Sequence, residues 1–104
     1  MTMKVSATGM SWYRREDYPR ILQIMLDAHK LHKTFNQWEK SAIGGEKHLI
    51  AQGHMVVRAI IVPDKFITWC RENRMLPNAS ARSRFATELA RQKLTQVSPN
   101  SGQA

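Results

Sequence analysis

The chain has 104 residues and a hydrophobic fraction of 42%, which fits one folded domain rather than a disordered chain. No apolar run approaches the ~20 residues that cross a bilayer, the first ten residues lack a signal-peptide layout, and the single cysteine excludes an internal disulfide, so we expect a cytoplasmic protein. Sixteen Lys and Arg against eight Asp and Glu give a net charge of +8, which favours polyanionic partners such as nucleic acid.

Residues 1–11 are small and polar, so they predict a flexible N-terminus or a short extended piece. A first helix is expected from Pro19, because proline suits the first helical turn and Glu16 and Asp17 supply negative charge beside it. Its apolar residues recur at helical spacing over residues 18–29.

Thr34 and Gln37 form a capping-box pattern at the start of a second helix. Gly53 suits the left-handed position that ends a helix. The pair Gly44-Gly45 conflicts with a helix interior, so either another element packs closely there or the helix bends.

A valine-rich strand follows at Met55–Val62, and Pro63 opens a third helix. Asn78 or Ser80 caps a fourth helix that runs to about Lys93. We therefore expect a mainly helical α+β fold in the order helix, helix, strand, helix, helix, with one central strand. Residues 12–94 form a single globular domain, and residues 95–104 form a disordered tail.

The lone strand needs a hydrogen-bonding partner, because buried backbone groups without one are costly. It can pair with the segment from Met10 to Arg14, with its own copy across a two-fold axis, or remain extended and covered on both sides. Pairing between two copies is favoured, which makes the protein a homodimer.

The segment "VVRAIIV", the helix "PDKFITWCREN" and the helix start "NASARSRFA" give the order strand, helix, helix. This order resembles the ribbon-helix-helix repressors, a resemblance that implies dimerisation through the strand and DNA binding by its outward side chains. The strand departs from that pattern, since only Arg58 offers a hydrogen-bond donor to a base edge.

A broader resemblance covers residues 34–86. It rests on Phe35-x-x-Trp38, the valine-rich strand before Pro63, the Trp69-Cys70 pair, and the sequence "ARSRFA". These features resemble a family of small uncharacterised bacterial proteins. The resemblance implies one intact bacterial domain and no known activity.

The sequence offers few candidates for a catalytic or metal-binding site. Cys70 lies on the inner stripe of its helix, which favours a buried thiol. The four histidines show no zinc spacing. Glu39 and Glu46 are seven residues apart beside an apolar face, so they predict ion pairs with Arg58 or Arg82 rather than an acid–base pair. We expect no enzyme activity, cofactor, metal or small-molecule substrate.

The C-terminal half has an excess of arginine, whose planar guanidinium suits phosphate. We therefore expect a small basic binding protein whose partner is nucleic acid, DNA included. The alternative is an interaction module with an acidic protein partner, and an enzyme that uses the paired glutamates is the least favoured reading. The expected nucleic-acid contacts are Arg58, Arg71, Arg74, Arg82, Arg84, Arg91 and Lys93.

Overall fold

The computed structural model describes residues 7–102, with side chains described over residues 7–94. The elements are β1 (Ala7–Trp12), η1 (Arg15–Asp17), α1 (Tyr18–Ile24), η2 (Ala28–Lys30), α2 (Phe35–Ala51), β2 (Met55–Ile60), α3 (Pro63–Glu72) and α4 (Ala79–Gly102). The fold is α+β and mainly helical, as expected.

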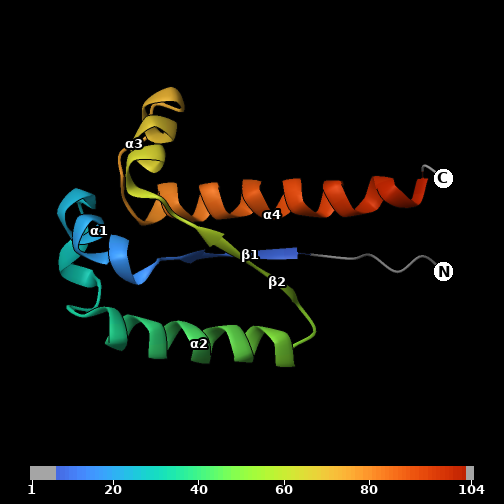
Figure 1. Ribbon diagram of the computed structural model, residues 1–104, viewed down its shortest axis with the longest axis horizontal. Coiled ribbons are helices and arrows are strands. Elements are labelled where there is room, and N and C mark those ends of the chain that lie inside the picture. Colours follow the sequence, from blue (N-terminus) through green and yellow to red (C-terminus); the bar gives the residue numbers. More distant parts are fainter. Residues whose placement is uncertain (1–6, 103–104) are drawn as a thin grey trace.

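The two strands form the middle layer of the molecule (Figure 1). Helix α4 packs along one side of this sheet and α2 lies on the other. Helices α1 and α3 gather at one end of the two long helices (Figure 1). The side chains of each strand alternate between the two helical layers.

The sheet overturns the expectation of a single strand. β2 pairs in parallel with β1, and the register runs from Ala7 opposite Met55 to Trp12 opposite Ile60. Residues 7–11 therefore belong to a strand rather than to a flexible N-terminus, although the alternative of a short extended piece is confirmed. Of the pairing partners considered, the N-terminal segment is the one observed within the chain, although the strand covers Ala7–Trp12 rather than Met10 to Arg14. Thr8 and Gly9 interrupt the apolar pattern at its start.

Gly9 allows β1 to lie directly against α4. A Cβ atom placed on Gly9 would fall 2.0 Å from the Ala86 carbonyl oxygen. Ala86 and Ala90, one turn apart, are both buried on the side of α4 that faces the sheet. Small residues on both elements therefore bring the two backbones together.

Aromatic side chains fill the space between the other side of the sheet and α2. The ring of Trp12 lies 5.1 Å from that of Trp38, edge to face, and Tyr13 lies 4.8 Å from Trp38. Tyr18 and Phe35 complete this cluster. Such pairs contribute about 0.5–1.5 kcal/mol each beyond their burial, so this cluster helps to hold α1 and α2 against the sheet.

The ends of α2 follow the sequence closely. The Thr34 hydroxyl accepts from the Gln37 N–H at 3.1 Å, and the Gln37 side chain accepts from the Thr34 N–H at 3.3 Å, which completes the capping box. Gly53 has φ +94° and ends the helix. A Cβ atom placed on Gly44 would meet nothing within 4 Å, and one placed on Gly45 would meet only the end of the Met10 side chain. Close packing therefore does not explain the glycine pair.

The first helix is shorter than its apolar spacing predicts. It begins at Tyr18 with Pro19 in its first turn, as expected, but Met25 is already extended. The Leu26 N–H donates to the Pro77 carbonyl at 2.9 Å, and Asp27 bonds to Arg82. These contacts with a distant part of the chain replace the next helical turn.

The last helix is longer than expected. Its backbone runs from Ala79 to Gly102, so the expected disordered tail is helical over residues 95–102. The remaining parts of the expected flexible ends, residues 1–6 and 103–104, lie outside the described residues.

Candidate nucleic-acid interface

Most carboxylates in residues 7–94 are engaged by arginines of the same chain. Six of the eight take part in ion pairs. The five arginines that hold them are Arg14, Arg20, Arg58, Arg82 and Arg84. The lysines of the same residues take part in none of these pairs, so the unpaired positive charge of residues 7–94 lies on six lysines and four arginines.

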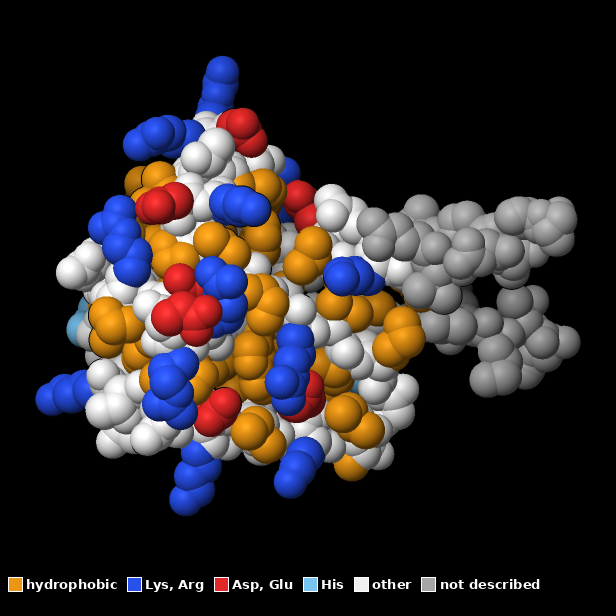
Figure 2. Space-filling model, viewed as in Figure 1, with side chains coloured by type: hydrophobic (Ala, Val, Ile, Leu, Met, Phe, Trp, Pro, Cys, Tyr) orange, Lys and Arg blue, Asp and Glu red, His pale blue; other side chains and the backbone are white. Residues whose placement is uncertain are grey.

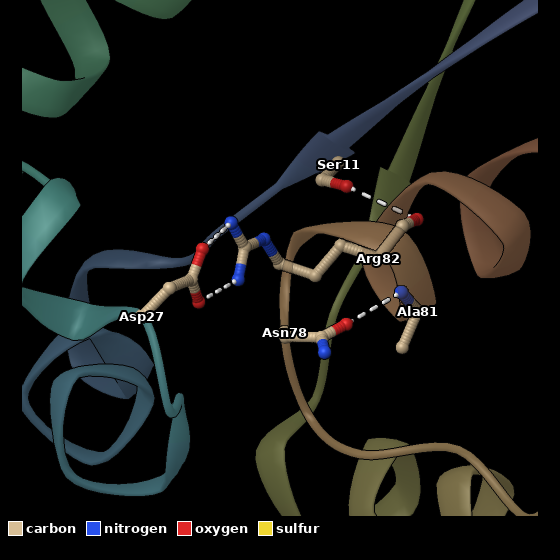
Figure 3. A network of polar contacts seen from close by, with 5 residues as sticks. All are labelled: Ser11, Asp27, Asn78, Ala81 and Arg82. Carbon is tan, nitrogen blue, oxygen red and sulfur yellow. Dashed lines mark hydrogen bonds and ion pairs between the residues drawn. The ribbon is translucent and has the colours of Figure 1, made fainter.

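Arg82 was expected to contact nucleic acid, but it is buried in an ion pair and holds parts of the fold together. It is 8% exposed, and its two terminal nitrogens donate to the Asp27 carboxylate at 2.8 and 2.9 Å (Figure 3). Its carbonyl accepts from the Ser11 hydroxyl, and Asn78 caps the same turn through the Ala81 N–H (Figure 3). Hydrogen bonding to Arg82 holds the pKa of Asp27 below its usual value. The pair therefore joins α4 to the segment after α1.

The Arg58 side chain is also engaged in contacts within the chain. Its guanidinium donates twice to Glu46, at 2.7 Å each, and lies 3.8 Å above the Trp12 ring. The hydrogen bond from Arg58 lowers the pKa of Glu46. The expected ion pair is confirmed for Glu46, whereas Glu39 makes none within residues 7–94. Arg58 is thus a neutralised residue of the sheet and a poor contact for phosphate.

Arg84 is exposed but takes part in an ion pair within the chain. It pairs with Glu88 at 3.0 Å, donates to Asn73 at 3.4 Å, and places its guanidinium 5.9 Å from the Trp69 ring. With Arg91 it lines a shallow groove of about 540 Å³ along α4. The groove also contains hydroxyl groups and the Glu88 carboxylate, so its charge is partly cancelled.

The other expected contacts are exposed, and Arg74 directly follows Asn73, whose side chain accepts a hydrogen bond from Arg84. Arg71 lies in the last turn of α3, and Arg74 follows it with φ +55°. Lys93 lies nine residues after Arg84 on α4, which places it about 180° around the helix from Arg84. The structure therefore brings Arg84 and Arg91 together and leaves Lys93 apart.

A second cationic surface, missed in the sequence, lies on α2. Lys33, Lys40 and Lys47 are exposed and take part in no ion pair within residues 7–94. Lys40 and Lys47 lie on α2 itself, where a spacing of seven residues is two helical turns less about 20° and spans about 10 Å. Lys33 lies just before the Thr34 cap and lines the same hollow as Lys40. We call the three lysines the α2 lysine face. Gly44 lies between the last two and adds no side chain.

Two hollows adjoin the Lys33 end of the α2 lysine face. One, of about 710 Å³, is lined by Leu31, His32, Lys33, Gln37, Lys40 and Ser41. The other, of about 370 Å³, shares Leu31 and Lys33 and includes His29. No carboxylate lines either hollow. Lys33 lines both hollows, so each has a positive charge and no negative one at its wall.

The signal for the α2 lysine face was present in the sequence. Glu39 and Glu46 drew attention through their seven-residue spacing, and each is followed directly by a lysine. A step of one residue turns the helix by about 100°. The same spacing therefore places the carboxylates beside the sheet and the lysines toward solvent.

Neither the cysteine nor the histidines build a reactive centre in the described residues. Cys70 is 3% exposed, and burial raises the pKa of its thiol, so the structure confirms its interpretation as a buried apolar side chain. Burial also raises the pKa of Tyr13 to about 12. Within the part of the chain that the structure describes, no three His, Cys, Asp or Glu side chains gather as metal ligands would.

Comparison with protein-family models, curated proteins and solved structures finds no match to this chain. Among residues 7–102, no helix combines the length and the hydropathy that crossing a membrane requires.

Proposed function

We propose that the chain is a small, basic, non-enzymatic binding protein that contacts the phosphate backbone of nucleic acid through the α2 lysine face. The observation that supports this proposal is the group of Lys33, Lys40 and Lys47, which are exposed and take part in no ion pair within residues 7–94. The nearest carboxylates in sequence, Glu39 and Glu46, lie about 100° around the helix from the lysine that follows each of them. Of the arginines expected to contact nucleic acid, Arg58, Arg82 and Arg84 are used in ion pairs of the chain, whereas Arg71, Arg74 and Arg91 take part in none within residues 7–94.

The form of the surface supports a backbone contact rather than base recognition. Lysine is a compact point charge on a flexible stem, so it neutralises phosphates without fixing their orientation. Contacts of this kind are independent of sequence and weaken as salt rises. The two hollows beside Lys33 add histidine and amide groups at one end of the α2 lysine face.

The test compares two triple variants with equal loss of charge. One is Lys33→Ala, Lys40→Ala and Lys47→Ala, and the other is Arg71→Ala, Arg74→Ala and Arg91→Ala. Fluorescence anisotropy with labelled duplex DNA and single-stranded RNA, over a series of salt concentrations, gives the slope of log K against log salt. The lysine variant should reduce the slope for duplex DNA by about 2–3, since each phosphate contact contributes about 0.9.

The arginine variant should leave that slope nearly unchanged. Loss of binding in the arginine variant alone would move the interface to α3 and α4. Absence of salt-dependent binding by the native chain to either nucleic acid would reject the proposal and favour an acidic protein as the partner of the same lysines.

A further inference from the structure

β2 has a second edge with which no described strand pairs. The Ile61 N–H donates to the Trp12 carbonyl, and with the parallel register this directs the backbone groups of Val57 and Ala59 toward β1. The N–H and C=O groups of Val56, Arg58 and Ile60 therefore point the other way. The sheet of the described chain ends there, because it contains two strands in the order β1-β2.

Apolar side chains are concentrated around this edge. Residues 7–94 expose five large hydrophobic side chains, and three of them belong to β2 or to the last turn of α2 before it. These are Ile50, Met55 and Ile60, which are 56%, 42% and 37% exposed. Figure 2 shows apolar side chains reaching the surface of the molecule between α4 and α2.

The edge also lacks the features that keep edge strands apart. Soluble proteins protect such strands with lysine, proline, a bulge or a covering segment. β2 contains neither lysine nor proline. Its one charged residue, Arg58, is bound to Glu46 and lies on the Trp12 ring, so it presents no free charge against an approaching strand.

We infer that the free edge of β2 pairs antiparallel with the same edge of a second copy of the chain. The two-fold axis stands perpendicular to the sheet and passes through Arg58. Val56 of one copy then faces Ile60 of the other, and all three outward-pointing residues of each strand find partners. Opposite residues share a face of the sheet in this register, as antiparallel pairing requires.

The partner strand that fits this two-fold arrangement is β2 of a second copy of the chain. Strands of equal length meet, apolar Val56 meets apolar Ile60, and the two arginines that meet on the axis are each neutralised by their own Glu46. The result is one sheet in the order β1-β2-β2-β1. An axis perpendicular to the sheet keeps each helix on its own side, so both α2 lysine faces lie on the same side of the dimer.

The test measures mass by sedimentation equilibrium over a range of protein concentrations, without nucleic acid. The native chain should dimerise, and Ile60→Lys should weaken the dimer at least about tenfold, because it places a charge in an apolar contact. Leu76→Lys is the matched control. It adds the same charge at a residue that is 63% exposed in the turn before α4, and it should leave the dimer intact.

The Val56→Pro variant distinguishes a loss of strand pairing between copies from a general loss of stability. The Val56 N–H points away from β1, so proline removes a hydrogen bond to the second copy and none within the chain. Its circular dichroism spectrum should match the native one while the dimer is lost. A native chain that stays monomeric at every concentration, or a dimer that survives both edge variants, would overturn the inference. Neither outcome bears on nucleic-acid binding, which is measured separately.

Discussion

Gly9 and Ala86 set the distance between β1 and α4, because the backbones meet where neither side chain is large. The contact joins residues that are far apart in the sequence, so nothing local in "ATGMSW" indicates it. Gly53 is the opposite case. Its place after an apolar helix predicts a left-handed conformation, and the structure shows φ +94°. The sequence therefore predicts the role of a glycine that depends on its own backbone conformation, as at Gly53. It does not predict a role that depends on contact with a distant residue, as at Gly9.

The same substitution should have opposite effects at two glycines. Gly9→Ala should lower the free energy of unfolding by at least about 2 kcal/mol, because its Cβ would meet backbone atoms of Ala86 that cannot move aside cheaply. Gly44→Ala should raise it by about 0.5–1 kcal/mol, because the site lies inside α2 with open space around it. Urea denaturation of both variants checks the pair. Equal destabilisation by both would contradict the close approach of β1 and α4.

Helix termini were the elements that the sequence predicted best. Thr34, Pro63 and Asn78 act through neighbours within a few residues, and all three begin helices as expected. The end of α1 was not predictable in the same way. Its apolar spacing continues past Met25, but contacts with Pro77 and Arg82 stop the helix. Local rules fail where a distant segment competes for the same backbone and side chains.

Thr34→Ala should destabilise the protein by about 1 kcal/mol, because it leaves the Gln37 N–H without its partner at the start of α2. Thr68→Ala is the matched control inside α3. There the hydroxyl donates only to the exposed Asp64 carbonyl of the preceding turn, and its loss should be close to neutral. Thermal unfolding followed at 222 nm measures both. A neutral Thr34→Ala variant would show that the capping box adds nothing to stability.

At the scale of the molecule, charge is divided between two tasks. Three arginines join separate parts of the chain through ion pairs, as Arg82 joins α4 to the segment after α1. The lysines of residues 7–94 take part in no ion pair. The sequence predicted the excess charge and the pairing of Glu46. It did not show that Arg58 and Arg82 are occupied by ion pairs of the chain, because their partners depend on how the helices and strands meet.

Asp27→Asn tests the bond between Asp27 and Arg82. It should cost about 3 kcal/mol near neutral pH, because the mostly buried guanidinium loses its counter-charge. The pKa of Asp27 is lowered in the folded state, so the pair stabilises the protein above the unfolded pKa, about 3.9. This contribution is lost as the pH falls through the folded value.

The difference between native protein and Asp27→Asn should therefore shrink in acid. Denaturation midpoints measured from neutral to acidic pH check this. Asp64→Asn provides the control, because its pair with Arg20 is exposed and contributes little. A constant difference between native protein and Asp27→Asn across this pH range would show that the ion pair is not the source of the loss.

The parallel register has a consequence for how the chain acquires its fold. Ala7 pairs with Met55, so β1 leaves the ribosome long before its neighbour in the sheet has been synthesised. Helix α2, whose cap and terminus are local, can form in the interval. Closing so long a loop costs entropy before the new contacts compensate for it. Sheet formation should therefore be the late and slow step, and the nascent N-terminal segment is the part that most needs protection from premature pairing.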